Sequence, residues 1–214
     1  MNETFKTIAV TTLLCAASGF TIAFFHASTA QLRQWQTQHR LQAAVEGVFP
    51  SEIRSIDTAS GAQRAWIGKI DSVTVGYAFV DEAMGYSGPI SAVVGIDTAG
   101  VITGVVILSE SENPSRGARM EEPLSQRTVW SDFHSNTEKK RPWFTEQFKG
   151  ITICKPILMS TGEEWPRLSQ QEKKDLIDKN SVSAISGATV SSRAVVRTIE
   201  KSAAPFNALR GTRQ

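Results

Sequence analysis

The stretch SAVVGIDTAGVITGVVILSE, residues 91–110, decides the fold class of this chain of 214 residues. Its two apolar runs, 91–97 and 101–110, are joined by the short turn sequence TAG, an arrangement typical of a β-hairpin. Just upstream, DSVTVGYAFV (71–80) places apolar side chains at alternate positions, which is the period of a half-buried strand. Three consecutive strands of this kind predict an antiparallel sheet, and we expect its aliphatic side chains to form the core.

Segments rich in turn-forming and charged residues adjoin the predicted strands. EAMGYSGPI (82–90) contains two glycines and a proline and therefore predicts a turn before the hairpin. SESENPSRGARMEEPLSQRTVWSDF (109–133) is polar, and we expect a loop beside the edge of the sheet. Four charged residues lie close together in this loop: Glu110, Glu112, Arg116 and Arg119. They fit either a solvated charged turn or the lining of a ligand pocket, and the sequence leaves both open.

Three segments in the C-terminal half predict helical structure. RPWFTEQFKG (141–150) spaces two phenylalanines four residues apart, as in a packed amphipathic turn. EEWPRLSQQEKKDLIDKN (163–180) predicts a solvent-facing helix anchored by a few apolar residues. RAVVRTIEKSAA (193–204) continues a helix that we expect to begin at 190–192. The predicted fold class is therefore α+β, an antiparallel sheet with flanking helices.

The N-terminal part predicts one transmembrane helix ahead of this domain. No charged residue occurs between Lys6 and Arg33. IAVTTLLCAASGFTIAFFHA (8–27) supplies about the 20 residues that cross a hydrocarbon core. A cleaved signal peptide is the alternative, since STA (28–30) has the small residues of a cleavage site. The apolar run is longer than a usual signal core, so we favour an uncleaved anchor, and basic residues on both sides leave its orientation open.

Composition and residue spacing exclude several classes of function. The formal net charge of +2, from 23 basic and 21 acidic residues, is far from the strongly basic surface of a nucleic-acid-binding protein. Cys15 and Cys154 form no pair with metal or redox spacing. His26, His39 and His134 lack the spacing of helical metal ligands, and no histidine and aspartate mark a triad with a serine. We therefore expect no nucleic-acid partner, no metal site and no catalytic side chain.

A stretch near the C-terminus, SAISGATVSSRAVV (183–196), combines small and hydroxylated residues at the start of a predicted helix. Unpaired backbone N–H groups and the positive dipole end favour an anion there, and small residues let a phosphate approach the backbone closely. Hydroxyls can donate hydrogen bonds to its oxygens. The candidate phosphate-binding residues are Ser186, Gly187, Ala188, Thr189, Ser191 and Ser192. The alternative is that the hydroxyls only cap the helix, because serine and threonine are favoured N-caps.

The same stretch carries a family resemblance. SGATVSS (186–192) resembles the flavinylation motif of FMN-binding domains, in which a threonine hydroxyl, here Thr189, is joined to the FMN phosphate by a phosphoester. GYSGPISAVVGID (85–97), VITGVVIL (101–108) and the Glu-x-Pro-x-x-Gly loop at 112–117 extend the resemblance. With one N-terminal span, they are similar to the G subunit of the Rnf-type ion-translocating electron transport complex. The C subunit of the sodium-translocating NADH:quinone reductase is a longer relative.

The resemblance implies covalent FMN at Thr189, with the isoalloxazine toward the loop after the third strand. Glu112, Asn113 and Gly117 are the flavin contacts that it implies in that loop. Two features depart from the family pattern. The family usually carries an acidic residue three positions before the Ser-Gly-Ala-Thr sequence, where this chain has Ser183, and its loop is commonly ETPGLG rather than ENPSRG.

The resemblance and the apolar pattern together divide the chain into five parts. We expect a short N-terminal tail (1–6), a transmembrane helix (7–30), a juxtamembrane helix (31–50), an FMN-binding domain (51–206) and a C-terminal tail (207–214).

The function implied by the resemblance is electron transfer through this FMN, within a ferredoxin:NAD oxidoreductase complex that couples redox chemistry to ion movement. The domain would lie on the periplasmic side of a bacterial inner membrane, with other membrane and iron–sulfur subunits as partners. A flavin transferase with FAD as donor is the implied maturation enzyme. Three alternatives remain: a component like the C subunit of the quinone reductase, a non-redox membrane-anchored binding or assembly module, and a free extracytoplasmic flavoprotein.

Overall fold

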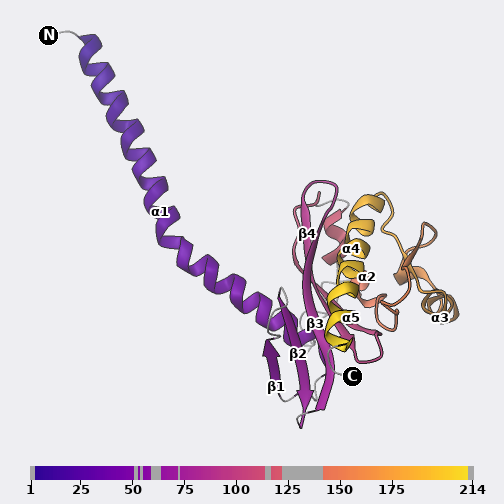
Figure 1. Ribbon diagram of the computed structural model, residues 1–214. Coiled ribbons are helices and arrows are strands. Elements are labelled where there is room, and N and C mark those ends of the chain that lie inside the picture. The colour runs from indigo at the N-terminus through magenta and orange to yellow at the C-terminus, as the bar shows by residue number, and fades with distance from the viewer. Residues whose placement is uncertain are drawn as a thin grey trace, which may run out of the picture. The chain divides into compact units, whose positions relative to one another are not determined.

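The chain falls into two compact units, Met1–Gln42 and Ala43–Gln214. The computed structural model describes residues 3–50, 53, 55–58, 64–71, 73–113, 117–121 and 142–211. The first unit is part of one long helix, α1 (Glu3–Val48; Figure 1). Large apolar side chains along it are exposed, and among the described residues α1 is the one helix long and apolar enough to cross a membrane. A membrane anchor and a signal sequence both meet this description.

The hydroxyl groups of α1 are compatible with apolar surroundings. Four threonines donate their hydroxyl hydrogens to carbonyl oxygens one turn earlier in the helix: Thr7, Thr11, Thr12 and Thr21. A hydroxyl bonded within its own helix needs no partner from the surroundings. These threonines therefore add little to the free-energy cost of placing α1 in lipid.

The second unit is built on a five-stranded antiparallel sheet in the order β1-β2-β3-β4-β5. The strands are β1 (Ser55–Thr58), β2 (Ala65–Ile70), β3 (Val73–Met84), β4 (Pro89–Asp97) and β5 (Ile102–Ser109). Each strand pairs antiparallel with the next. The predicted antiparallel sheet and the hairpin of β4 and β5 are confirmed, and the sheet has two further strands before them.

The turn predicted over 82–90 is wrong at both ends. Met84 still pairs with Pro89, so β3 runs to Met84 and β4 begins at Pro89. Only the four residues between them form the turn, which is closed by a hydrogen bond of 2.8 Å from the Gly85 N–H to the Gly88 carbonyl. Turn-forming residues at 85–88 therefore do not interrupt the pairing of the strands on either side.

Short helices and a small second sheet follow the five strands. They are η1 (Gly117–Glu121), α2 (Trp143–Glu146), β6 (Leu158–Ser160), η3 (Trp165–Arg167), α3 (Gln170–Asp178), β7 (Ser181–Ser183), α4 (Thr189–Lys201) and α5 (Ala203–Gly211). β6 and β7 pair in parallel. α4 and α5 lie along one face of the large sheet, with α4 against β3 and β4 (Figure 1).

The main core lies between that face of the sheet and the helices. Strand alternation places Tyr77 and Phe79 of β3 opposite Ile96 and Val94 of β4, and all four side chains are buried in one cluster. Phe206 of α5 packs edge-on against Tyr77, with ring centroids 5.7 Å apart. Tyr77 and Phe79 of the period-two pattern therefore face α4 and α5, whereas Val73 at the start of that pattern is exposed.

The opposite face of the sheet receives the end of α1. Gly95 and Gly104 are paired across β4 and β5, and Val48 lies against both. The Thr103 hydroxyl donates a hydrogen bond of 2.7 Å to the Val48 carbonyl oxygen. A Cβ atom on Gly95 would lie 2.7 Å from that same oxygen, so only glycine permits this close approach.

The packed turn predicted over 141–150 is confirmed. Phe144 and Phe148 are fully buried, and their rings meet edge-to-face at 5.6 Å. The helix predicted over 163–180 is wrong in its first part, because Pro166 lies in the separate element η3 and α3 begins only at Gln170. A capping box of Ser169 and Glu172 starts α3 there.

The helix expected to begin at 190–192 begins at Thr189 as α4, and α5 follows it after Ser202. The boundaries between tails, transmembrane helix, juxtamembrane helix and domain stay predictions.

Candidate functional site

The segment that leads into α4 is anchored by a buried glutamine. Gln147, which has no exposed surface, accepts a hydrogen bond of 2.7 Å from the Ser183 N–H and donates one of 3.0 Å to the Ser183 carbonyl. The Ser183 hydroxyl donates to the carbonyl oxygen of Glu163. Ser183, which stands where the family usually has an acidic residue, is therefore a buried part of β7 whose polar groups are bonded internally.

The N-terminus of α4 has no side-chain cap. The N-cap residue is Ala188, and the interpretation of the nearby hydroxyls as simple N-caps is therefore wrong. Gly187 just before it has a φ of +75°, a left-handed conformation that strains other residues. Among the described residues, no group accepts from the backbone N–H groups of 189–191. The first turn of α4 thus presents the unpaired donors that an anion can use.

The four hydroxyl residues among the candidate phosphate-binding residues divide into two pairs. Ser191 and Ser192 are buried: Ser191 donates to Glu112, while Ser192 accepts from the Ile185 N–H and donates to the Ala188 carbonyl. Ser186 is exposed. Thr189 is half-buried, and no described residue forms a hydrogen bond with its hydroxyl group. Ser186 and Thr189 are therefore the two of these residues that are not buried.

Glu112 is brought from the loop after β5 into contact with the start of α4. Its Oε2 accepts the hydrogen bond of 2.8 Å from the Ser191 hydroxyl, and its Oε1 accepts from the Tyr86 N–H at 2.7 Å. Gly117 packs against the Glu112 side chain, whereas Asn113 is exposed. Of the three loop residues predicted to contact flavin, the structure thus buries two and leaves Asn113 at the surface.

A second carboxylate lies on the other side of the stretch. Glu164 accepts two hydrogen bonds from the Arg119 guanidinium, at 3.0 and 3.1 Å, and one of 3.0 Å from the Ser186 N–H. Burial by itself raises the pKa of the Glu164 carboxyl, but the hydrogen bonds from Arg119 and Ser186 outweigh it and hold the pKa below its usual value. Of the charged residues noted in the loop, Arg119 is therefore buried in part as an ion-pair partner.

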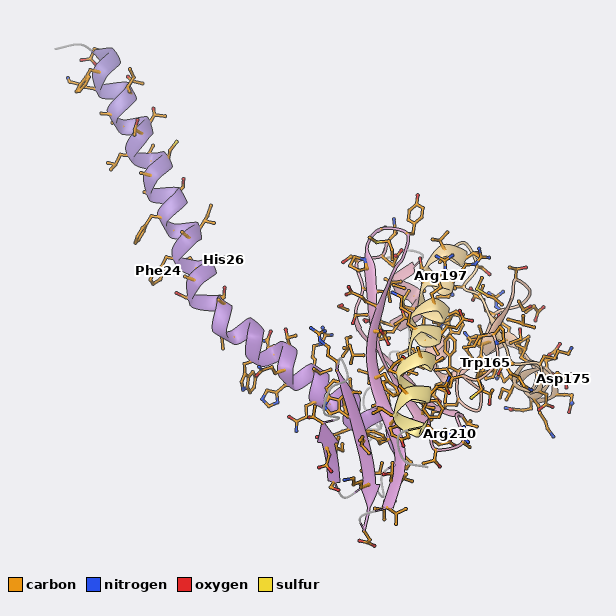
Figure 2. The ribbon with its side chains drawn as sticks, in the orientation of Figure 1. Phe24, His26, Trp165, Asp175, Arg197 and Arg210 are labelled. Carbon is orange, nitrogen blue, oxygen red and sulfur yellow. The ribbon has the colours of Figure 1, made fainter. Side chains whose placement is uncertain are left out.

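Two arginines share a face of α4 with Thr189. Arg193 and Arg197 follow it at intervals of four residues, and both are exposed (Figure 2, where Arg197 is labelled). Side chains on a helix lean toward its N-terminus, so Arg193 reaches back toward the Thr189 turn. Sequence reasoning missed these arginines, although their i, i+4 spacing from Thr189 was a usable signal. It also missed Glu164, for which no spacing signal exists.

Other residues considered in the sequence take no part in this arrangement. Cys15 and Cys154 are free thiols, both exposed. Within the described residues, no group of three histidine, cysteine or acidic side chains could hold a metal ion. His134 and Arg116 lie outside the described residues.

Comparison with known proteins identifies the family. The FMN-binding domain family matches residues 85–204, more than half of the chain, and this range contains every candidate site residue. The chain belongs to the FMN-binding domain family. A curated relative, the G subunit of the Na(+)-translocating ferredoxin:NAD(+) oxidoreductase complex of Acetobacterium woodii, is 26% identical over 167 residues. That alignment covers 75% of this chain and 66% of the relative, just under two thirds of its length.

Two solved structures are also similar to this family member. The C subunit of the Na(+)-translocating NADH-quinone reductase from Parabacteroides distasonis is 20% identical, with a TM-score of 0.40 over 69% of this chain and 59% of that one. NqrC from Shewanella oneidensis is 17% identical, with a TM-score of 0.45 over 78% of this chain and 74% of that one. The resemblance stated from the sequence is confirmed at the level of the FMN-binding domain and its distant relationship to the Rnf-type G subunit.

Proposed function

We propose that this protein is a membrane-anchored electron-transfer subunit that carries FMN covalently on Thr189, within an Rnf-type ion-translocating ferredoxin:NAD oxidoreductase complex. The family match over 85–204 implies FMN, and the curated relative supports the type of complex. The observation that carries the proposal is the position of the half-buried Thr189 in the uncapped first turn of α4. A phosphate joined to this oxygen lies next to the unpaired N–H groups of the same turn.

The residues around Thr189 fit a flavin phosphate. Gly187 and Ala188 keep the approach to the backbone free of large side chains, and the exposed Ser186 hydroxyl can donate to a phosphate oxygen. Arg193 supplies a guanidinium on the same helix face, which suits the negative charge of a phosphodiester. The site is supported on its buried side by Ser191 and Ser192. It is bordered by three loop residues, Glu112, Asn113 and Gly117.

Attachment needs a transferase but no oxidant. A bond forms between the Thr189 hydroxyl oxygen and the phosphorus of the FMN half of FAD, the pyrophosphate bond of FAD breaks, and AMP leaves. The hydroxyl proton passes to a base of the flavin transferase or to water. Bound FMN supplies the redox chemistry, while the residues of this chain hold and orient it.

The N-terminal helix gives the proposed location. We place α1 in a bacterial inner membrane as an uncleaved single span, with the FMN-binding domain on the periplasmic side. The partners are other membrane and iron–sulfur subunits of the complex. Support comes from the apolar length of α1 and from the name of the curated relative.

The test is the intact mass of the full chain produced together with an active flavin transferase and then denatured to remove loosely held ligand. We expect the wild type to gain the mass of one FMN less one water, and Thr189→Ala to gain nothing. Thr161→Ala, which removes an exposed threonine hydroxyl outside the stretch, is the matched control and should be modified like the wild type.

Other outcomes select among the alternatives. A wild type without adduct, beside a transferase that modifies another substrate, refutes covalent attachment and favours the non-redox binding or assembly module. An adduct with quinone-reductase subunits copurifying favours a component like the C subunit of that reductase. An adduct on a chain that forms no complex favours a free extracytoplasmic flavoprotein.

A further inference from the structure

The side chain of Glu112 connects three segments that are distant in the sequence. It lies in the loop after β5, and its carboxylate touches the β3–β4 turn on one side and the first turn of α4 on the other. We propose that Glu112 is a positioning residue: it fixes the first turn of α4, and with it Thr189, in the geometry that accepts FMN, without itself contacting the flavin. This inference rests on the proposed function of Thr189.

Both carboxylate oxygens of Glu112 are already occupied. Oε1 accepts from the Tyr86 N–H at 2.7 Å and from the Ser87 N–H at 3.2 Å. Oε2 accepts from the Ser191 hydroxyl at 2.8 Å. Hydrogen bonds to an ionised acceptor are roughly twice as strong as neutral ones, so these three bonds join the turn and the helix firmly. These three bonds use three of the roughly four acceptor positions of a carboxylate, so Glu112 has little capacity left for a flavin group.

Two glycines enclose the same side chain. A Cβ atom on Gly85 would collide with the Glu112 Oε1, and one on Gly117 would lie 2.6 Å from the Glu112 Cβ. Glu112 is only 6% exposed in this enclosure. Among the described residues, protein atoms therefore enclose most of the carboxylate and leave little of its surface for a direct contact with an isoalloxazine ring.

The bond to Ser191 adds to the core packing of α4 in holding the first turn of this helix in place. Ser191 is two residues after Thr189 in the same first turn, so fixing the backbone at Ser191 also fixes the backbone position from which the Thr189 side chain extends. Ser192 holds the preceding backbone through the Ile185 N–H. The position of the carboxylate at the positive end of α4 also offsets the cost of burying its charge.

A positioning role predicts that the hydrogen-bonding shape of residue 112 matters more than its charge. In Glu112→Gln, the amide oxygen can accept from the Tyr86 and Ser87 N–H groups, while the amide NH2 donates to the Ser191 hydroxyl. Glu112→Ala loses all three bonds. A general base would behave differently, because the amide could not take the Thr189 proton and both variants would fail alike.

The test uses four variants of the full chain in detergent. They are Glu112→Ala, Glu112→Gln, Ser191→Ala and the control Glu200→Ala. Glu200 is the matched control because it also lies on α4 and also accepts a backbone N–H, from Ile157 at 3.1 Å, but near the other end of the helix. Two quantities are measured: hydrogen exchange of the flavin-free chain, and kcat/KM for flavin transfer from FAD by a purified flavin transferase.

Hydrogen exchange reports on the hydrogen bonds of Glu112 in the absence of flavin. In Glu112→Ala we expect the amides of Tyr86 and Ser87 to exchange at least about tenfold faster than in the wild type, since their acceptor is gone. Ser191→Ala should leave those two amides protected and loosen only the first turn of α4. Glu200→Ala should change neither region.

Flavin transfer reports on the consequence for Thr189. We expect kcat/KM to fall at least about tenfold in Glu112→Ala. Each lost hydrogen bond to a charged acceptor corresponds to a factor on the order of ten. Glu112→Gln should stay within about threefold of the wild type, since it keeps the three contacts. Ser191→Ala should lie between these two, and Glu200→Ala within about twofold of the wild type.

Specific outcomes overturn the inference. Transfer to Glu112→Gln as slow as to Glu112→Ala would show that the carboxylate charge itself is needed. Transfer to Glu112→Ala and Ser191→Ala at the wild-type rate would show that the hydrogen bonds of Glu112 do not affect flavin attachment at Thr189. If Glu112→Ala does not fold, the Ser191→Ala and Glu112→Gln arms decide alone. A wild type that takes up no FMN would instead refute the proposed function. The exchange data would still test whether Glu112 holds the β3–β4 turn and the first turn of α4.

Discussion

Gln147 makes the clearest quantitative prediction for the stability of the domain. Its side-chain amide bonds to both the N–H and the carbonyl of Ser183, in the way that a neighbouring strand would. Among the described strands, β7 pairs with β6 alone, and Gln147 takes the place of a strand on the other side of β7. Replacing Gln147 by alanine removes this partner from two buried backbone groups at once.

The size of the effect follows from the burial of both residues. Gln147 has no exposed surface and Ser183 is 1% exposed, so water cannot reach the orphaned groups without rearrangement. An unsatisfied buried donor or acceptor costs about 1–3 kcal/mol, and two of them give roughly 2–6 kcal/mol. Gln171→Ala is the matched control: Gln171 is exposed, and its hydrogen bond to Asp175 is on the surface, so we expect a change within about 0.5 kcal/mol.

Gln147→Glu separates hydrogen bonding from packing. The carboxylate can accept from the Ser183 N–H, but as an anion it cannot donate to the Ser183 carbonyl. The protonated acid can donate, so the folded state binds the proton more tightly than the unfolded state does. The resulting loss of stability is therefore largest at neutral pH and disappears below the ordinary pKa of glutamate, about 4.3.

The assay is urea unfolding of the full chain in detergent, followed by tryptophan fluorescence at pH 7 and again at acid pH. We compare the free energy of unfolding of each Gln147 variant with that of the wild type at the same pH. A Gln147→Ala variant as stable as Gln171→Ala would refute the reasoning, because another group would then have to satisfy Ser183. A Gln147→Glu variant whose deficit does not shrink in acid would refute the role of the donated hydrogen.

Two further predictions concern packing and charge. Gly95→Ala should lower the free energy of unfolding by about 1–3 kcal/mol, because the new Cβ meets the Val48 carbonyl oxygen at 2.7 Å. Gly104→Ala should be tolerated, because the nearest atom to its new Cβ is 3.4 Å away. Equal losses of stability in the two variants would contradict this prediction. Because the pKa of Glu164 is lowered, its bond to Arg119 contributes fully to the stability of the domain above the ordinary glutamate pKa of about 4.3. This contribution is lost as the pH falls below that value. The difference in free energy of unfolding between wild type and Glu164→Gln should therefore shrink from pH 7 to acid pH.

The strands that could be predicted are those with a clean apolar pattern. β3, β4 and β5 alternate or run continuously in apolar residues, and strand pairing rewards those patterns directly. β1 is a four-residue strand whose residues are mostly exposed, so its sequence SIDT carries almost no pattern. β2, AWIGKI, is short and has a shift of register after Gly68. Both depend on pairing with β3 rather than on their own composition.

The start of the candidate site could be predicted, but its supports could not. Small and hydroxylated residues before α4 are a local signal, since a helix start and its anion-binding groups lie within one turn. Gln147 and Glu164 bond to this segment from 36 and 22 residues away, and Glu112 from 79. Nothing in a single sequence marks such pairs, because only the folded chain brings them together.

Acidic and basic side chains are separated around the start of α4. The two carboxylates nearest the stretch face inward: Glu112 is engaged by N–H and O–H donors, and Glu164 is paired with Arg119. Their negative charge is thus already neutralised or shared inside the protein, while the exposed face after Thr189 carries Arg193 and Arg197. An anion at the first turn of α4 therefore meets unpaired N–H groups, and the exposed Arg193 follows one turn later on the same helix face. Two buried acids engaged inside the protein, together with two arginines on the exposed helix face, support our proposal that this turn holds a flavin phosphate.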